Sequence, residues 1–294
     1  MNAAAAPVRK AVLPAAGFGT RFLPITKSVP KEMLPVGDKP VIHYVVAEAV
    51  AAGCTDILII VSRDKSSIVD YFDRAPDLER RLRAAGKDEL ADEIVRIATQ
   101  ARFHFVRQPE MKGLGDAVLQ ARDHVGDEPF ALLLADTIIV DSSGVPGQPA
   151  ALDTLHAAYG ETGASAVAIE HVPADRISRY GVVGGTERAP GRFTLERMVE
   201  KPAPAEAPAV RRLDGTVDPG GWAFAARYLF TPAVFAHLAR TRPGKNNEIQ
   251  LTDAMAALLA EEGFSGCRLP GERLDIGNPR GLFEANRRIL SLDA

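Results

Sequence analysis

The sequence predicts an α/β fold around a mainly parallel sheet, and two observations support this expectation. Short apolar runs that suit buried strands alternate with longer amphipathic runs that suit helices, chiefly in the first half of the chain, and this alternation is typical of βαβ units. The chain has 294 residues, which is enough for a full hydrophobic core and for one large domain or two ordinary ones. We therefore expect helices to connect strands that run parallel to one another.

The first half of the chain is the more regular. Strands are predicted at residues 11–15, 57–61, 103–106 and 130–135, and amphipathic segments at 41–50, 67–72 and 115–125. Pro40 stands where the first of these segments can begin as a helix, and Gly53 where it can end. Residues 76–101 are charged, rich in Ala and Leu and helical in period, which predicts a helical hairpin on the surface.

The second half has shorter and less regular elements. Strands are predicted at 164–170, 179–185, 192–202 and 222–230, and helices at 232–238, 251–262 and 280–290. Residues 202–221 are rich in Pro and Gly, which predicts a loop. Trp222, which follows two glycines, is interpreted as a packing residue.

The composition excludes several classes of protein. Hydrophobic residues make up 46% and charged residues 25% of the chain, and the mean hydropathy is -0.03, as in ordinary globular proteins. Lys and Arg (35) nearly balance Asp and Glu (38), and this net charge of -3 indicates no nucleic-acid partner. No stretch approaches the roughly 20 apolar residues of a membrane span, and no signal peptide is recognisable. We expect a cytoplasmic protein without a membrane partner.

Cysteine and histidine give no signal of a metal or redox site. Cys54 and Cys267 are too few for a disulfide framework and too far apart for a metal knuckle, so both are expected to be buried thiols. The six histidines lack H-x-x-x-H and H-E-x-x-H spacings, so no zinc site is expected.

The first candidate site follows the first predicted strand. Gly17 and Gly19 interrupt the segment V-L-P-A-A-G-F-G-T-R-F-L-P, and Arg21 follows them. Glycines at such a turn let backbone N–H groups approach a phosphate, and the Arg supplies positive charge for its oxygens. The spacing matches neither the G-x-G-x-x-G dinucleotide motif nor the G-K-S/T of a P-loop. On this segment alone, a structural turn and a phosphate site are equal alternatives.

Prolines stiffen the loop after this turn. They recur four times between residues 24 and 40, and three lysines lie among them, Lys27, Lys31 and Lys39. Each proline fixes its own φ, so these lysines stand on an ordered frame. That position favours binding of an anion over simple solvation.

Five motifs in a fixed order resemble those of a known family. They are P-A-A-G-F-G-T-R-F-L-P-I-T-K-S-V-P-K-E-M-L-P-V-G-D-K-P, R-Q-P-E-M-K-G-L-G-D-A-V, M-V-E-K-P, N-E-I-Q-L-T-D-A and L-D-I-G-N. Over nearly the whole chain they resemble the bacterial sugar-1-phosphate nucleotidyltransferases, most closely members that use UTP and glucose 1-phosphate. The resemblance implies a Rossmann-like three-layer sandwich with a mainly parallel mixed sheet. It also implies a single domain, residues 1–294, with a nucleotide-binding half at 1–140 and a sugar-binding half with the C-terminal helices at 141–294.

The resemblance further implies a reaction. These enzymes join a nucleoside triphosphate to a sugar 1-phosphate by in-line attack on the α-phosphorus, releasing pyrophosphate, so catalysis depends on cations and positioning. Arg21 and Lys31 match the pair that neutralises the triphosphate, and Lys201 matches the lysine that holds the sugar phosphate. The backbone implied to lie against the nucleotide is that of Ala16, Gly17 and Gly19.

Base recognition is expected from two residues. Gln108 lies five residues before Gly113, and the two match the family's pair that reads the base. A Gln amide can both donate and accept along a pyrimidine edge. A structural role for Gln108 at the end of a strand is the alternative.

Carboxylates indicate a metal and a sugar subsite. Asp136 ends an apolar strand, and a carboxylate at the carboxyl edge of a parallel sheet is well placed to hold Mg²⁺ on phosphate oxygens. By resemblance, Asp275 lies near the same metal, Glu200 accepts sugar hydroxyls, and the backbone of Gly181 touches the sugar.

Some positions depart from the family's pattern. Asn278 stands in place of an acid, Ala226 in place of a Gly beside the sugar, and the loop at 203–221 is long. These departures leave open a thymidylyltransferase or another sugar 1-phosphate. A non-catalytic nucleotide-sugar-binding regulator is disfavoured because the cationic residues are present, and a glycosyltransferase because Asp136 is not part of a D-x-D motif. The family also suggests a homo-oligomer, a dimer or a tetramer.

Overall fold

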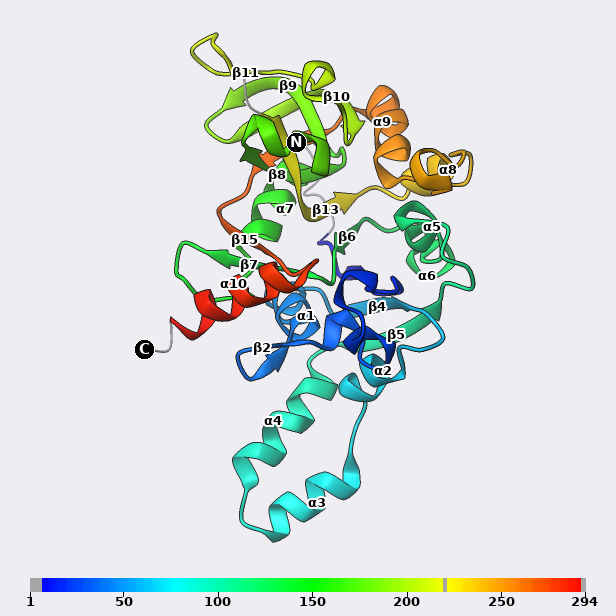
Figure 1. Cartoon of the computed structure of the whole chain (residues 1–294), viewed down its shortest axis with the longest axis vertical. Coiled ribbons are helices and arrows are strands. Elements are labelled where there is room, and N and C mark those ends of the chain that lie inside the picture. Colours follow the sequence, from blue (N-terminus) through cyan, green and yellow to red (C-terminus); the bar gives the residue numbers. More distant parts are fainter. Residues whose placement is uncertain (1–6, 219–220, 292–294) are drawn as a thin grey trace.

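A mixed sheet forms the centre of the molecule (Figure 1). The computed structural model describes residues 7–218 and 221–291. Within these residues the strands lie in the order β12-β11-β9-β10-β14-β8-β13-β6-β1-β4-β5, and two small sheets pair β7 with β15 and β2 with β3. Helices alternate with the strands of the first half. The predicted α/β class is therefore confirmed.

Parallel strands from the first half form one end of this sheet. They are β1 (Lys10–Pro14), β4 (Asp56–Val61), β5 (Arg102–Arg107) and β6 (Phe130–Leu133). β1 lies between β4 and β6, and β5 lies at the outer edge beside β4, all with parallel register. These strands match the predicted runs at 11–15, 57–61, 103–106 and 130–135. Parallel pairing is possible here because helical crossovers separate them.

The other strands pair largely antiparallel, so the predicted predominance of parallel pairing is wrong for the second half. β9 joins β10 directly through Pro190 and Gly191, and so short a connection can link only antiparallel strands. β13 also runs antiparallel to β6, β8 and β9, whereas β14 is parallel to β8. The strands concerned are β8 (Ala166–Val172), β9 (Gly181–Ala189), β10 (Arg192–Glu200), β11 (Val210–Arg211), β12 (Val217–Asp218), β13 (Gly221–Phe230) and β14 (Ser265–Arg268).

Helices pack on both faces of the sheet. One buried cluster joins the sheet to α1 (Val41–Ala51) and α7 (Ala150–Thr162). A second buried cluster, formed by side chains on the other face of the same strands, joins the sheet to four helices. These are α5 (Leu114–Leu119), α6 (Arg122–Val125), α8 (Val234–Leu238) and α9 (Leu251–Glu262). The amphipathic run predicted at 115–125 is thus divided into two short helices, and α7 was not predicted.

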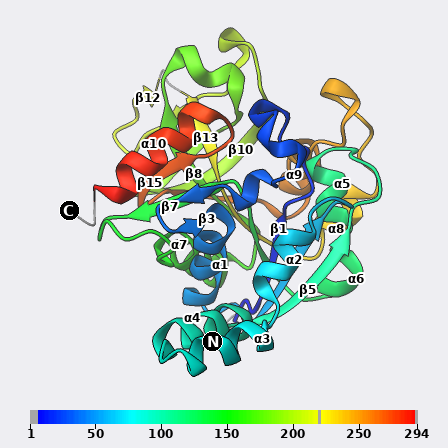
Figure 2. The same ribbon diagram turned by 60° about the horizontal axis from the view of Figure 1, so that its bottom comes forward.

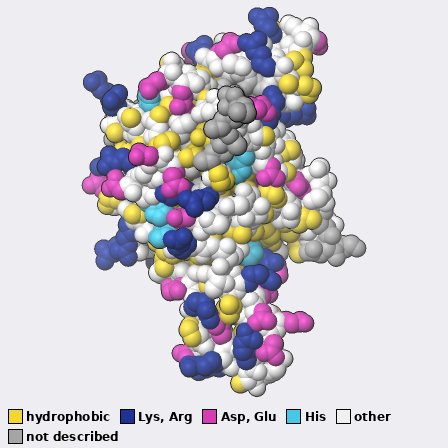
Figure 3. All heavy atoms as spheres, turned by 180° about the vertical axis from the view of Figure 1, so that it is seen from behind, with side chains coloured by type: hydrophobic (Ala, Val, Ile, Leu, Met, Phe, Trp, Pro, Cys, Tyr) yellow, Lys and Arg dark blue, Asp and Glu magenta, His cyan; other side chains and the backbone are white. Residues whose placement is uncertain are grey.

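The predicted helical hairpin projects from the body of the molecule (Figure 1). It consists of α3 (Pro76–Ala84) and α4 (Asp88–Thr99), and it follows α2 (Ser66–Phe72). Charges of both signs are interspersed on the face of the hairpin that Figure 3 shows, and Arg83 pairs with Asp88 at 3.3 Å and Asp92 at 2.6 Å. The hairpin therefore does not present a surface of one charge sign.

The C-terminal segment returns to the first half of the chain. β15 (Gly271–Asp275) pairs antiparallel with β7 (Thr137–Asp141), and α10 (Pro279–Leu290) lies beside these strands (Figure 2). The side chain of Asn286 in α10 accepts a hydrogen bond from the backbone N–H of Gly37 at 3.0 Å. Gly37 lies between β2 (Pro35–Val36) and β3 (Lys39–Pro40). The last elements thus buttress the proline-rich loop.

The buried residues agree with the predictions made for them. Trp222 is 2% exposed, and its ring lies 4.9 Å from that of Phe193, which confirms the packing role. Cys54 and Cys267 are buried free thiols. Among the described residues, no helix has the length and apolar character needed to span a membrane.

Candidate active site

A cavity of about 390 Å³ lies at the carboxyl ends of β1 and β6. The chain leaves β1 through α1 on one face of the sheet, whereas it reaches β6 through α5 and α6 on the other. Such a switch in strand order opens a crevice beyond the strand ends. The residues predicted for the site that line this cavity are Ala16, Gly17, Gly19, Lys31, Gln108, Gly113 and Asp136.

The glycine turn and the proline-rich loop form one wall of this cavity, the predicted nucleotide cavity. Gly19 has φ 65°, and its carbonyl oxygen accepts a hydrogen bond from Thr26 Oγ1 at 2.8 Å. A Cβ at Gly19 would lie 3.3 Å from the Cβ of Lys31, so the turn packs directly on the short 3₁₀ helix Lys31–Met33. The loop therefore brings Lys31 back to the end of β1, while Lys27 is exposed.

Lys31 and Asp136 form an ion pair in the wall of the cavity. Lys31 Nζ lies 2.5 Å from Asp136 Oδ2, and both side chains are about a quarter exposed or less (21% and 25%). Burial opposes the charge on Lys31, but the carboxylates of Asp136 and Glu32 outweigh it and raise its pKa. Burial likewise opposes the charge on Asp136, but the Lys31 ammonium lowers the pKa of Asp136. Both groups are therefore charged at neutral pH.

A second, deeper ion pair supports this arrangement. Glu32 Oε2 accepts a hydrogen bond from Lys65 Nζ at 2.7 Å, and the residues are 1% and 5% exposed. Burial raises the pKa of Glu32 in spite of Lys65. Because Glu32 adjoins Lys31 in the chain, its fixed side chain holds the Lys31 backbone in place. Nothing in the spacing of Glu32 and Lys65 indicated this pair.

The predicted base-reading residues lie together and also line the cavity. Gln108 is 4% exposed, and its Nε2 donates to the carbonyl oxygen of Gly113 at 3.2 Å and to Asp116 Oδ2 at 2.7 Å. These bonds close the loop at 108–113 on itself and fix the amide at the cavity.

Glu248 and Ile249 pack against this loop. A Cβ at Gly113 would lie 2.8 Å from the carbonyl oxygen of Ile249. Ile249 also accepts a hydrogen bond from the N–H of Gly115 at 2.9 Å. Glu248 lines the cavity, although the sequence assigned it no role. Its position in the motif N-E-I-Q-L-T-D-A is the sequence feature that could have identified it.

Arg21 and Asp275 do not line this cavity, and both contact Gly277, which lies just before α10. Arg21 Nη1 lies 3.4 Å from the carbonyl oxygen of Gly277, whose own N–H donates to Asp275 Oδ1 at 2.9 Å. Asn278, which stands in place of an acid, caps α10 by accepting a hydrogen bond from the N–H of Gly281. The departure at this position therefore has a structural use.

The three predicted sugar residues form a separate cluster. Gly181 lies opposite Glu200 in the pairing of β9 with β10, and a Cβ at Gly181 would lie 2.9 Å from Glu200 Oε2. Glu200 pairs with Lys201 at 3.0 Å and accepts a hydrogen bond from Thr252 Oγ1 at 2.7 Å. Lys201 has φ 45°, a strained backbone conformation of the kind that collects at functional sites.

Arg273 links the cluster of Glu200 and Lys201 to Asp275. Its guanidinium lies 5.0 Å from the ring centre of Tyr180 and 3.2 Å from Asp275 Oδ2, and it also pairs with Glu170. The carbonyl oxygen of Tyr180 in turn accepts a hydrogen bond from the N–H of Lys201 at 3.0 Å. The sequence did not identify Arg273, because only the folded sheet brings it between the two groups.

The carboxylates of Asp136 and Asp275 extend from neighbouring backbone positions. Asp275 pairs with Thr137, and the N–H of Ile276 donates to the carbonyl oxygen of Asp136 at 3.0 Å. Both side chains supply oxygen, the donor type that Mg²⁺ prefers. A carboxylate has about four acceptor sites, so the contacts with Lys31 and Arg273 leave room for a cation. The donor set therefore fits Mg²⁺.

Comparison with known proteins agrees with this geometry. Residues 10–291 match the family described as Nucleotidyl transferase. The chain is 43% identical to UTP–glucose-1-phosphate uridylyltransferase YngB of Bacillus subtilis (strain 168), over 96% of this chain and 89% of that protein. It is similar to a UDP-glucose pyrophosphorylase solved with UDP-glucose (TM-score 0.83, 39% identity, 97% and 99% covered). It is also similar to a UTP-bound enzyme of this type from Acinetobacter baumannii (TM-score 0.85, 36% identity, 98% and 94% covered). The chain belongs to the nucleotidyl transferase family.

Proposed function

We propose that the protein transfers a uridylyl group from UTP to glucose 1-phosphate, giving UDP-glucose and pyrophosphate. The observation that carries the proposal is the arrangement of Lys31, Asp136 and the glycine turn around a 390 Å³ cavity, with the cluster of Glu200 and Lys201 beyond it. The names and ligands of the similar proteins support the same substrates.

The chemistry follows from the charges of the two reactants. An oxygen of the sugar phosphate attacks the α-phosphorus, forming one P–O bond, while the bond from the α-phosphorus to the bridging oxygen breaks and pyrophosphate leaves. Both reactants are anions, so positive groups must hold them in line. In this proposal Arg21 and Lys31 neutralise the triphosphate and the leaving group, and Lys201 holds the sugar phosphate. The backbone of residues 16–19 lies against the nucleotide.

Recognition of base and sugar is assigned to the two remaining groups. The amide of Gln108, with the backbone of Gly113, reads uracil, and Glu200 accepts sugar hydroxyls beside the backbone of Gly181. Asp136 and Asp275 would hold Mg²⁺, which supplies positive charge to phosphate oxygens when bound.

The finer description of the architecture is also part of the proposal. We infer a Rossmann-like three-layer sandwich in a single domain, with residues 1–140 binding the nucleotide and residues 141–294 binding the sugar. The helical clusters on the two sheet faces support the three layers. The protein would act in the cytoplasm as a dimer or tetramer.

One assay tests the function. Pyrophosphate release is measured with Mg²⁺ and glucose 1-phosphate for UTP, dTTP, CTP, ATP and GTP in turn. We expect release chiefly with UTP. Preference for dTTP would identify a thymidylyltransferase instead, and release only with another sugar 1-phosphate would correct the sugar. No release with any pair would refute the proposed reaction.

A further inference from the structure

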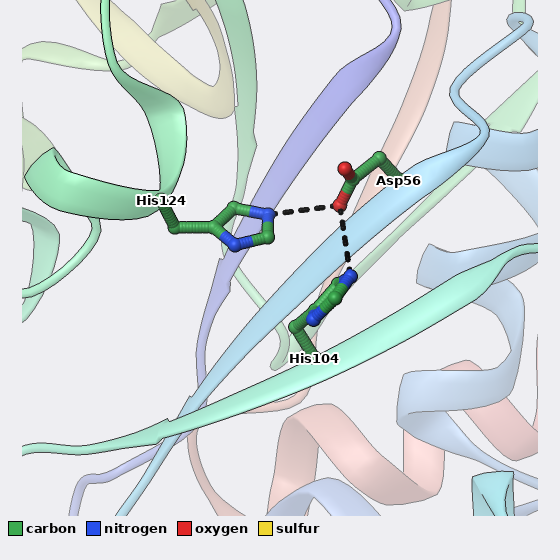
Figure 4. A group of neighbouring side chains, drawn as sticks. All are labelled: Asp56, His104 and His124. Carbon is green, nitrogen blue, oxygen red and sulfur yellow. Dashed lines mark hydrogen bonds and ion pairs between the residues drawn. The ribbon is translucent and has the colours of Figure 1, made fainter.

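Two histidines and an aspartate meet at the edge of the sheet far from the nucleotide cavity (Figure 4). Asp56 is the first residue of β4, His104 lies in the edge strand β5, and His124 lies in α6. The nucleotide cavity lies at the carboxyl ends of the parallel strands, whereas Asp56 begins its strand. This histidine–aspartate cluster is therefore distinct from the site described above.

The fold itself directs the three side chains toward one point. Asp56 pairs with Arg102, and Leu58 with His104, so Asp56 and His104 project from the same face of neighbouring strands. Leu58 on that face packs in the cluster that includes Val125 of α6. His124, one residue before Val125, reaches the same face from the helix. Separate elements supply the groups, which is why the spacing of histidines in the sequence gave no signal.

The distances suit a small cation. Asp56 Oδ1 lies 2.8 Å from His124 Nε2 and 3.7 Å from His104 Nε2, and the three atoms lie within 4.8 Å of one another. Bonds of about 2.0–2.1 Å in a tetrahedral zinc site would place such atoms about 3.3 Å apart. The two observed distances lie on either side of that value. Small side-chain rotations would bring all three atoms into contact with one ion.

Neighbouring groups hold His124 in position. Lys10 Nζ donates to the carbonyl oxygens of His124 and Val125 at 3.0 and 2.9 Å, and it pairs with Glu128 at 2.7 Å. The end of α6 is thereby tied to β1, and the Lys10 charge is balanced by Glu128. The side chains of Asp56, His104 and His124 are 19%, 42% and 23% exposed, so an ion can reach them from solvent.

We propose that Asp56, His104 and His124 bind one divalent transition-metal ion of the zinc type. Imidazole nitrogens favour zinc, nickel, cobalt and copper over Mg²⁺, which prefers an oxygen shell. Three protein ligands leave a position for water. The ion joins β5 to α6, and the chain between them contains the loop at 108–113 and α5. Binding therefore stabilises both ends of the segment that carries Gln108.

The test is direct binding of ZnCl₂ to the chelator-treated full-length protein, measured by titration calorimetry. We expect one zinc ion per chain, and affinity at least tenfold weaker in His104→Ala and in Asp56→Asn. Asp56→Asn keeps a hydrogen-bond acceptor for His124, so circular dichroism should show an intact fold. Excess Mg²⁺ should not displace the zinc.

The chain offers a matched control. His171 pairs with Asp218 at 3.0 Å with side chains 45% and 19% exposed, close to the values for His104 and Asp56, but no third ligand joins them among the described residues. His171→Ala should bind zinc as the unmodified protein does. Zinc should also slow amide hydrogen exchange in residues 108–113, and this effect should disappear in His104→Ala. Absence of zinc binding, or equal binding in His104→Ala, would overturn the proposal. These readouts do not depend on the proposed uridylyl transfer.

Discussion

The buried ion pair between Glu48 and Arg227 gives the sharpest stability prediction. Glu48 in α1 and Arg227 in β13 have side chains that are 1% and 0% exposed, and two hydrogen bonds of 2.8 and 2.7 Å join them. The guanidinium also donates to the carbonyl oxygens of Thr137 at 2.9 Å and Ala226 at 3.0 Å. Replacing Glu48 with Leu would leave a positive charge without a partner in the core.

Two independent estimates of the cost agree. Each hydrogen bond to a charged group contributes about 1.5–3 kcal/mol, so losing two costs about 3–6 kcal/mol. Breaking a buried ion pair by removing one partner costs about 3–5 kcal/mol. In the double variant Glu48→Leu/Arg227→Met both charges are gone, but the carbonyl oxygens of Thr137 and Ala226 lose their donor. We expect the double variant to be more stable than Glu48→Leu by at least about 1 kcal/mol, because it buries no unpaired charge.

Urea unfolding followed by circular dichroism measures these free energies. Arg80→Ala is the control, because Arg80 and Asp77 form an exposed pair (78% and 83%) whose loss should cost at most about 1 kcal/mol. The reasoning is refuted if Glu48→Leu costs less than 1 kcal/mol, as that control is expected to do. It is also refuted if the cost of the double variant equals the sum of the costs of Glu48→Leu and Arg227→Met measured separately.

Three further predictions concern the candidate active site. Lys31→Ala and Lys201→Ala should each lower kcat by about 10²–10³-fold without loss of fold, because each removes a preorganised cation. Near-normal turnover in either variant would show that the replaced lysine does not have the role assigned to it. Gln108→Ala should lower kcat/KM for UTP by about tenfold, which corresponds to the loss of one to two hydrogen bonds. The ratio of kcat/KM for UTP to kcat/KM for CTP should also fall, and an unchanged ratio would leave Gln108 with a structural role only. The depressed pKa of Asp136 means that its pair with Lys31 stabilises the fold above the unfolded carboxyl pKa of about 3.9 and is lost as pH falls through the lower, folded value. The raised pKa of Lys31 keeps the pair intact up to an unfolded pKa of about 10.4. The difference in unfolding free energy between the protein and Asp136→Asn should therefore be flat across neutral pH and shrink only in acid or strong base, whereas a step near pH 6–8 would contradict the pairing.

The first half of the fold could be predicted because its signals are local. Val41–Ala51 forms a helix between a proline and a glycine, and the strand at Asp56–Val61 continues from Asp56 as a run of aliphatic residues. In the second half several strands were recognised, but not the pairings that join segments far apart in the sequence. Nothing within Gly271–Asp275 itself indicates that it pairs with Thr137–Asp141.

The candidate site shows the same division. Asp136 could be named because a carboxylate at a strand end is recognisable by itself. The stiff loop indicated three candidate lysines, and the family resemblance singled out Lys31 among them. Lys65 and Arg273 could not be named, because each acts through a partner from another element. Supporting residues of this kind carry no periodicity or spacing of their own.

The pairing of β15 with β7 has a consequence for the order of events during synthesis. The amino-terminal part of a chain is synthesised first, so β1, β4, β5 and β6 are complete before β15 is made. Asp275 reaches Asp136 only after β15 has been added, and α10 then secures the proline-rich loop through Asn286. The last elements of the chain thus complete the candidate site that the first elements begin.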